Sequence, residues 1–297
     1  MVYPMNRQIG GALALLLLAS PLPAFSQGMD ALSFSGDLEF EHTRRNGASG
    51  TMAGGELFLR YEGPIGFELG ADIDQNLDNG DDNTVPYLAV TFGFGPGEVA
   101  LGAPQPVADQ LIDIPDFAGI RELQLGIDQR TTSLVTGFAK SLGEQVYGAR
   151  LTAETGALRY GASIHGVTDQ SGAFWQVAGE YEARSGTQIE GVVEGEDGNL
   201  GVTVGANHQA GQFDMGVYLT SQRIIGDTES ALAYVGYSVT PSLTVRGHLR
   251  TEDGTVNGNA IGVEAEYGFS NGAYAQFGAA DGNNTSMTLD ASVGFKF

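Results

Sequence analysis

The sequence predicts an all-β protein, a transmembrane, antiparallel, up-and-down β-barrel of sixteen strands. Three observations lead to this fold class. Apolar and polar residues alternate with a period of two in many short segments, as they do in strands with two different faces. Short and long connections take turns along the chain, which is typical of barrels with tight turns at one end. The chain also finishes on an apolar strand, SVGFKF, that runs to the last residue, Phe297.

The first segment, residues 1–26, has the features of a secretory signal peptide. The charged Arg7 precedes an apolar run and a group of small residues that ends at Ser26, which is the order found in signal peptides. The apolar run is shorter than the ~20 residues that a membrane-spanning helix needs. We therefore expect cleavage after Ser26 and a single barrel domain over residues 27–297.

Composition restricts the class of protein further. The chain has no cysteine, 45 glycines, 11 tyrosines and 15 phenylalanines, so no disulfide holds an exported chain together and strands with tight turns are favoured over helices. No apolar stretch is long enough for a transmembrane helix. The net charge of −22 argues against nucleic acid as a partner, because acidic surfaces repel phosphate.

Alternation defines the strands in order. In the first of them, residues 32–41, Leu32, Phe34, Leu38 and Phe40 alternate with polar residues. The same pattern recurs fifteen times, through residues 57–62, 65–74, 85–94, 97–102, 145–154, 157–168, 173–183, 187–194, 200–209, 212–222, 229–238, 243–251, 260–269, 273–280 and 287–297.

Two kinds of connection separate these strands. The short ones are GP, TG, RSG, TPS and SNG, and the longer, polar ones are TRRNGASGTM, NLDNGDDNT, GEDGN, RIIGDTES, EDGTVNGN and DGNNTS. Outer-membrane barrels have short periplasmic turns and longer external loops, and this arrangement fits them. It fits a soluble sandwich less well, because a sandwich also needs crossover connections.

The segment from Ala103 to Glu144 interrupts the pattern. Its first half, APQPVADQLIDIPDFAGI, contains three prolines and resists assignment as a strand. Its second half, RELQLGIDQRTTSLVTGFAK, has enough alternation for an extra hairpin, which would raise the count to eighteen. We favour sixteen strands and a long third loop that folds into the lumen, since connections of this length are usually functional.

The two faces of the strands are assigned by size. A barrel of about sixteen strands is too wide for its side chains to fill, so its interior holds water and its apolar face meets lipid. An unpaired strand edge is prohibited in lipid, so the last strand pairs with the first. We expect Phe295 and Phe297 to close the barrel and to lie in the aromatic girdle at the periplasmic boundary.

The third loop supplies the candidate constriction. Asp109, Asp113 and Asp116 would carry negative charge into the lumen, opposite a basic patch drawn from the inward residues Arg60, Arg150, Arg159, Arg246 and Arg250. Opposed charges across a narrow aqueous gap filter solutes by size, charge and dipole. For any single arginine, the alternative is a solvated wall residue without a role in selection.

Enzymatic and metal sites find little support in the residues. The motif H-E-x-x-H and the P-loop are absent from the sequence, so we do not expect an enzyme. Asp78, Asp81 and Asp82 in LDNGDDN offer oxygens of the kind that calcium prefers. They do not match an EF-hand loop, and acids that keep the loop hydrated are the favoured interpretation, with no cofactor required.

The opening strand LSFSGDLEFE, the stretch LGAPQPVADQLIDIPD and the closing ASVGFKF, together with the signal peptide, resemble the general diffusion porins of alpha-proteobacteria. The resemblance implies a homotrimer of sixteen-stranded barrels in the Gram-negative outer membrane, a third loop with acids opposite arginines, calcium between loops in some members, and a terminal strand that the outer-membrane assembly machinery reads. The chain differs from that family in its short loops and in having only two lysines, Lys140 and Lys296.

These observations predict a passive channel for small hydrophilic solutes and ions, driven by the solute gradient alone. Its partners would be outer-membrane lipid, other copies of the chain and the solutes. The alternatives are a substrate-selective channel and a non-conducting barrel that acts in adhesion through its loops. The excess of acids in the loops and at the constriction predicts a weak preference for cations.

Overall fold

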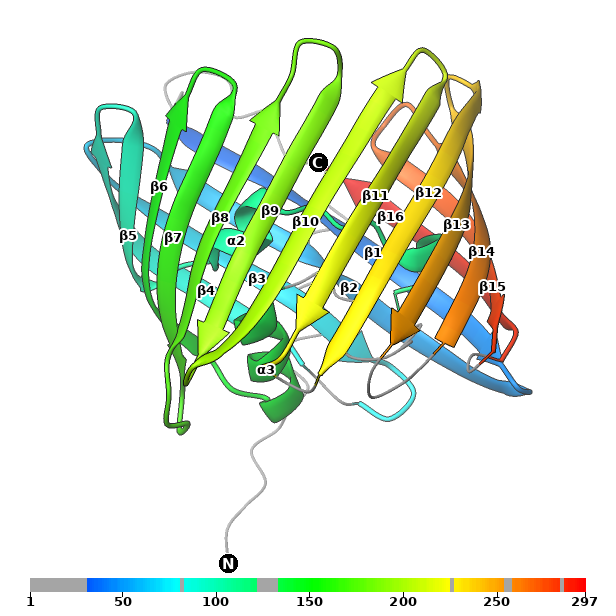
Figure 1. The fold of residues 1–297 in the computed structure, drawn as a ribbon, viewed down its shortest axis with the longest axis horizontal. Helices are drawn as coiled ribbons and strands as arrows, with labels where there is room; N and C mark the ends of the chain where they lie inside the picture. The colour runs from blue at the N-terminus through cyan, green and yellow to red at the C-terminus, as the bar shows by residue number, and fades with distance from the viewer. Residues whose placement is uncertain (1–30, 81–82, 122–132, 225–226, 254–257, 284–285) are drawn as a thin grey trace, which may run out of the picture.

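A computed structural model describes residues 31–80, 83–121, 133–224, 227–253, 258–283 and 286–297, so the predicted signal peptide lies outside the described residues. The strands form one closed antiparallel barrel (Figure 1), in which each strand pairs with its neighbours in sequence and the last pairs with the first. The sixteen strands are β1 (Leu32–Arg45), β2 (Ala48–Tyr61), β3 (Ile65–Asn76), β4 (Val85–Phe94), β5 (Gly97–Ala103), β6 (Val146–Thr155), β7 (Leu158–Val167), β8 (Phe174–Glu182), β9 (Thr187–Glu196), β10 (Asn199–Ala210), β11 (Phe213–Gln222), β12 (Thr228–Thr240), β13 (Leu243–Asp253), β14 (Gly258–Gly268), β15 (Ala273–Gly282) and β16 (Thr288–Lys296).

The barrel closes between its first and last strands, as the terminal residues predict. Leu38 of β1 lies opposite Phe295 of β16. The N–H of Phe297 donates to the carbonyl of Gly36 at 3.0 Å, and the N–H of Gly36 donates to the carbonyl of Phe297 at 3.1 Å. The ring of Phe297 stacks on that of Phe34, with centroids 4.8 Å apart. The edge that lipid would not tolerate is thus paired to the last residue.

The two faces of the sheet differ in chemistry as predicted. Apolar side chains such as Ile65, Leu88 and Leu249 are more than 60% exposed, whereas the charged Glu68 and Arg150 are almost completely buried. A soluble protein has the opposite distribution, with its charges outside. The exposed apolar residues therefore form the outer face of the barrel and the ionic residues its inner face.

Two of the predicted long connections are instead two-residue hairpin turns. Asn46 and Gly47 join β1 to β2, with Arg45 opposite Ala48, and Asp197 and Gly198 join β9 to β10. All four turn residues have positive φ, from 46° to 87°, the conformation of the type I′ turn that Asn-Gly and Asp-Gly favour. The segment TRRNGASGTM is therefore mostly strand, and its prediction as a long loop was wrong.

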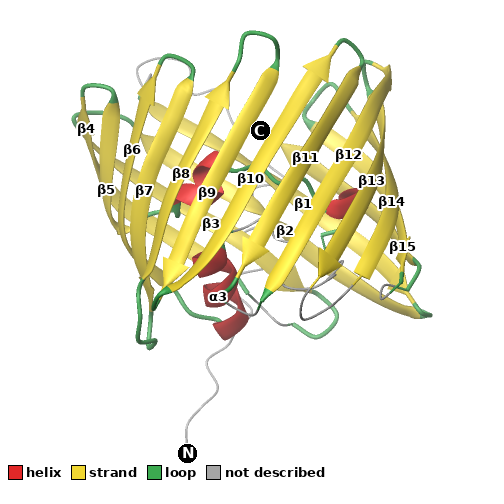
Figure 2. Ribbon diagram, in the orientation of Figure 1, coloured by secondary structure: helices red, strands yellow, loops and turns green. Residues whose placement is uncertain are grey.

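The segment between β5 and β6 is partly helical (Figure 2). It contains α2 (Val107–Leu111), the 3-10 helix η1 (Phe117–Gly119) and α3 (Leu134–Leu142), and residues 122–132 within it are not described. Since α3 occupies part of the proposed extra hairpin and the closed sheet has sixteen strands, the eighteen-stranded alternative was wrong. None of the helices in the described part of the chain is long and apolar enough to cross a bilayer.

Apolar packing holds this segment against strands on different sides of the barrel. Val107 and Leu111 pack with Ala178 of β8 and Val192 of β9, and Phe117 and its neighbours pack with side chains of β11, β12, β14 and β15. Helix α3 packs against β2, β4, β6, β7 and β8 through its buried residues. Because these strands are well separated around the ring, the segment connects sides of the inner face that the sheet itself does not join.

Candidate functional site

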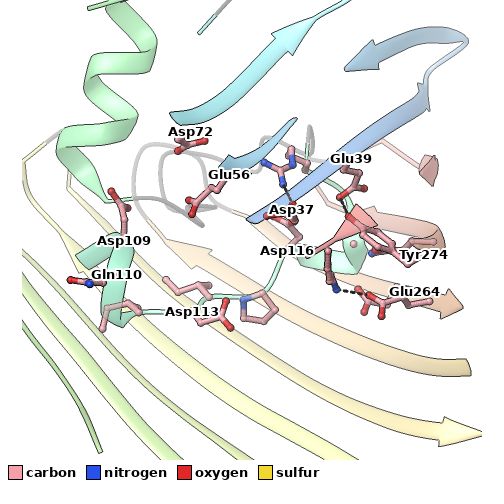
Figure 3. A pocket seen from close by; sticks show the side chains of 18 of the residues that line it. Asp37, Glu39, Glu56, Asp72, Asp109, Gln110, Asp113, Asp116, Glu264 and Tyr274 are labelled. Atoms are coloured by element: carbon pink, nitrogen blue, oxygen red, sulfur yellow. Dashed lines mark hydrogen bonds and ion pairs between the residues drawn. The ribbon is translucent and has the colours of Figure 1, made fainter. Parts of the chain in front are cut away.

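A cavity of about 580 Å³ lies between the segment 109–121 and the inner face of the barrel (Figure 3). Ten carboxylates line it against four basic side chains, so its charge is strongly negative. The acids come from β1, β2, β3, β8, β14 and the segment itself, and they are Asp37, Glu39, Glu56, Asp72, Asp109, Asp113, Asp116, Glu180, Glu264 and Glu266.

A second cavity, of about 610 Å³, lies toward the turn between β4 and β5, where Gly95 and Pro96 line it. Both cavities share Gln110, Leu111 and Arg159 in their linings. Helix α2 therefore borders both cavities through Gln110 and Leu111.

The start of the segment is fixed by a buried ionic cluster, the Glu68 clamp, which consists of Arg60, Glu68, Arg150 and Gln105. Arg150 donates from Nη2 to Glu68 Oε2 at 2.8 Å and from Nη1 to the carbonyl of Gln105 at 2.9 Å. Glu68 Oε1 accepts from the N–H of Gln105 at 2.8 Å, and Oε2 accepts from Arg60 at 2.8 Å. Both backbone polar groups of Gln105 are thus satisfied by one buried ion pair.

Asp109 connects α2 to the first turn of α3. Its carboxylate accepts from the Ser133 hydroxyl at 2.8 Å, from the Thr136 hydroxyl at 2.6 Å and from the N–H of Ser133. Burial raises the pKa of Asp109 to about 6, the three hydrogen bonds oppose this rise, and the charge of Asp72 adds to it. Asp109 therefore holds α3 in place in addition to lining the cavity.

Asp113 is held through its backbone while its side chain is exposed to the cavity. Its N–H donates to Glu190 Oε2 at 3.3 Å, and its carbonyl accepts from the Tyr218 hydroxyl at 2.8 Å. Figure 3 shows its carboxylate apart from the other labelled acids. Its negative charge is accordingly available to water and ions.

The opposite end of the cavity is the Arg121 corner, which consists of Asp37, Glu39, Asp116 and Arg121. Arg121 Nη2 lies 3.7 Å from Asp37 Oδ2, and Glu39 Oε2 accepts from the Tyr274 hydroxyl at 2.9 Å. Asp37, Glu39 and Asp116 lie near one another in Figure 3. The guanidinium of Arg121 thus contacts Asp37, and the charges of Glu39 and Asp116 also act on it.

The pKa values of the two groups of this corner that belong to the segment reflect this crowding. Burial raises the pKa of Asp116 to about 6, because the charge of Arg121 lowers it less than burial and the nearby carboxylates of Glu39, Glu264 and Asp37 raise it. Burial alone would lower the pKa of Arg121, but the carboxylates of Asp116, Glu39 and Asp37 outweigh it and raise that pKa.

The five predicted wall arginines do not form one patch. Arg60 and Arg150 meet at Glu68, Arg159 donates to Glu180 at 2.7 Å, Arg246 donates from Nε to Asp214 at 2.7 Å, and Arg250 donates to Glu252 at 3.1 Å. Each one is therefore paired with a carboxylate of the wall. Of these five, only Arg159 and Arg246 line the acidic cavity beside the segment 109–121.

Sequence reasoning missed the acids of the wall. Asp37, Glu39, Glu56 and Asp72 line the cavity, yet the expectation placed acids on the loop and bases on the wall. The signal was present in GDLEFE, where the acids occupy alternate positions between outward apolar residues. It also missed Arg121, which directly follows the stretch that contains the three aspartates.

The loop acids that were considered for calcium lie elsewhere. Asp78 Oδ2 accepts from the N–H of Thr51 at 2.8 Å, so it holds the β3–β4 connection against β2, and Asp81 and Asp82 lie outside the described residues. In the described ranges no three acidic or histidine side chains are grouped as metal ligands would be.

The chain has the fold of known bacterial porins. No protein-family profile and no curated protein matches it. Among solved structures it is similar to a multiply substituted variant of the Rhodopseudomonas blastica porin, with a TM-score of 0.67 and 14% identity over 90% of this chain and 100% of that chain. A triple variant of the same porin gives 0.64 and 13% with the same coverage, and a structure described under asymmetric conductivity of engineered proteins gives 0.67 and 14%. The fold thus agrees with the sequence resemblance.

Proposed function

We propose that this protein is a passive, water-filled channel of a Gram-negative outer membrane that conducts ions and small hydrophilic solutes and favours cations. One observation carries the proposal. The closed barrel turns apolar side chains outward and ionic side chains inward, and ten carboxylates line the cavity beside the segment 109–121. The fold shared with porins supports the same function, and the solute gradient would be the only driving force.

The negative lining favours cations for a simple electrostatic reason. In a cavity with low-dielectric walls, excess carboxylates raise the local concentration of cations and lower that of anions. Four basic side chains do not balance ten acids, and the arginines of the wall are already paired. Size still limits entry, because the segment 104–121 occupies part of the interior and narrows the path.

Single-channel recording in planar bilayers tests the proposal. We expect stable current steps that are linear in voltage, with a reversal potential in a salt gradient that favours cations. Current that saturates with one sugar or acid would indicate a substrate-selective channel. Absence of current from a correctly folded barrel would overturn the proposal and favour an adhesive or structural barrel.

We further propose that the mature chain begins after residue 26 and assembles as a homotrimer. Semi-native gel electrophoresis before and after boiling tests the assembly, because closed trimeric barrels keep a compact, slower-migrating form in detergent until they are heated. A chain that migrates as a monomer without heating would contradict it. N-terminal sequencing of the membrane-extracted protein identifies the cleavage site.

A further inference from the structure

The Arg121 corner differs from the other ionic groups of the interior in its ratio of charges. At Glu180 one arginine meets one carboxylate. Arg60 and Arg150 meet Glu68 and Glu98, and Arg246 meets Asp214 and Glu264. Around Arg121, by contrast, the charges of Asp37, Glu39 and Asp116 act on one guanidinium, and the second cation nearby, Lys296 opposite Asp37, is paired with Glu266. The negative charge that remains is next to water, because the side chains of Asp37 and Arg121 are 31% and 21% exposed.

The contacts of the guanidinium are looser than those of a structural ion pair. Its approach to Asp37 is 3.7 Å, compared with 2.8 Å between Arg150 and Glu68. The Nε atom of Arg121 is buried and has no acceptor among the described residues, which is also true of Arg150 Nε, so the difference between the two lies in the distance to the carboxylate. A weakly held cation in a cluster of carboxylates occupies the position at which a mobile cation would otherwise reside.

The wall beside Arg121 leaves room for its side chain. At Gly54 of β2 an added Cβ would lie 2.8 Å from Arg121 Cδ and 3.0 Å from Nε. Gly54 does not adopt a positive φ, so alanine is compatible with the backbone there and its methyl group would conflict only with the arginine side chain. The position of the guanidinium therefore depends on this glycine.

We propose that Arg121 is the residue that sets the strength of the channel's cation selectivity, acting as a tethered counter-ion for Asp37, Glu39 and Asp116. The inference rests on the proposed channel function and specifies which residue tunes it. With Arg121 present, one of the three negative charges is neutralised and cations are favoured weakly. Without it, permeating cations take the place of the guanidinium.

Charge removal at this position is the first test. For Arg121→Gln we expect the ratio of cation to anion permeability, obtained from the reversal potential in a KCl gradient, to rise about threefold, the effect of one unit charge acting through a few ångströms of water. Arg121→Lys should stay close to the unsubstituted protein because it keeps the charge.

Two matched controls separate position from net charge. Arg159→Gln removes the same charge from the same cavity, but Arg159 faces the single carboxylate of Glu180, so we expect a smaller rise. Arg223→Gln removes a charge that is 67% exposed in the β11–β12 connection, and no change is expected. An equal rise in Arg121→Gln and Arg159→Gln would overturn the proposal, because selectivity would then follow total charge.

Block of the current by free guanidinium distinguishes a role of Arg121 in selectivity from a purely structural role. In Arg121→Ala, millimolar guanidinium chloride should reduce the potassium current by occupying the vacated position, whereas sodium chloride at the same concentration should not. The unsubstituted protein should respond equally to both salts. Equal responses in the variant would contradict the inference.

A second variant keeps the test informative if the Arg121 variants do not fold. Gly54→Ala displaces the guanidinium without removing its charge, and a smaller rise in cation preference is expected. Gly247→Ala is the control, since an added Cβ there meets nothing within 4 Å. If the unsubstituted protein conducts and no variant shifts the reversal potential, this inference alone is wrong. If the unsubstituted protein carries no current, the proposed function is wrong.

Discussion

Two groups of ionic side chains inside the barrel use the same residue types in different ratios. In the Glu68 clamp, one carboxylate accepts from two arginines and a backbone N–H, all at 2.8 Å in their shortest contacts. In the Arg121 corner, three carboxylates share one guanidinium that lies 3.7 Å from Asp37. The clamp is almost dry, with Glu68 and Arg150 side chains at most 1% exposed, and the corner is in contact with the cavity.

The comparison shows that the number of cations per carboxylate and the burial of the pair decide whether a charge stabilises the fold or acts on ions. A buried carboxylate that receives several hydrogen bonds is fixed, and its main effect is to hold Gln105, where the third loop begins. A carboxylate that shares one cation with other carboxylates is only partly neutralised, so its negative potential acts on nearby ions. We therefore expect substitutions in the clamp to change stability and substitutions in the corner to change selectivity.

The largest effect is expected from breaking the clamp. Arg150→Met removes one partner of a buried pair and leaves the carbonyl of Gln105 without its donor, which should lower the free energy of unfolding by about 3 kcal/mol. Urea titration of the barrel in detergent, followed by its heat-dependent gel mobility, measures the change.

Arg60→Met is the matched control for the clamp. Arg60 binds the same carboxylate of Glu68, but its side chain is 28% exposed, so the loss should be about 1 kcal/mol or less. Equal losses in the two variants would show that burial does not distinguish these arginines, and the clamp would lose its proposed role.

Removing acids from the corner tests the other side of the comparison. Asp37→Asn combined with Asp116→Asn should lower the ratio of cation to anion permeability about fivefold, since each unit charge acting through water contributes about 0.5 kcal/mol. Stability should change little in this variant. A large loss of stability without a change in reversal potential would mean that the corner is a second clamp.

Acidification should lower cation preference, as the substitutions of Asp37 and Asp116 do. Burial raises the pKa of Asp109 and that of Asp116 to about 6, so both take up protons between about pH 7 and pH 5, and cation preference should fall about fivefold. Both pKa values are raised when the segment 109–121 is packed against the inner face of the barrel. Protonation of Asp109 and Asp116 therefore stabilises this packing. This contribution to stability is complete below about pH 4 and is lost as pH rises through about 6. Reversal potentials measured from pH 8 to pH 5 provide the check, and Asp116→Asn should lose about half of the change.

The faces of the barrel could be predicted from the sequence because lipid and water impose them locally. Alternate residues of a strand face opposite sides, so Leu249 and Arg250 had to differ in environment, and they do. Closure by Phe295 and Phe297 followed from the same constraint, since lipid excludes a free edge. These conclusions need only the period of the pattern and the thickness of the membrane.

The ionic partners could not be predicted in the same way, because they depend on register between strands. Arg60 lies directly opposite Glu68, Arg159 opposite Glu180 and Arg246 opposite Glu264. The first pair flanks the short GP turn and was within reach of the sequence, whereas the other two are joined by longer connections. Cross-strand pairing thus places a carboxylate beside each of these three arginines.

Helix α3 was misread for a related reason. Its sequence LVTGFAKSL contains β-branched and aromatic residues that suit a strand, but Ser133 accepts from the N–H of Thr136 as an N-cap and Gly143 ends the helix with φ of 67°. These capping residues are the local signals of a helix. Packing of Leu134 and Val135 against the inner wall then decides the outcome, and that packing depends on the closed barrel.

The smallest effect is expected at Asp113, and it completes the comparison by removing a carboxylate that belongs to neither group. Its side chain is exposed in the cavity and only its backbone is held by Glu190 and Tyr218, so Asp113→Asn should leave stability unchanged and lower cation preference about twofold in dilute salt. The effect should vanish near 1 M salt, where the screening length falls to about 3 Å. The Asp37 and Asp116 variant should keep part of its effect there, because partly buried charges are screened less. If Asp113→Asn shifts the reversal potential as strongly as that double variant at both salt concentrations, selectivity arises from the exposed rim of the segment, and the unequal sharing of Arg121 has no special effect on ions.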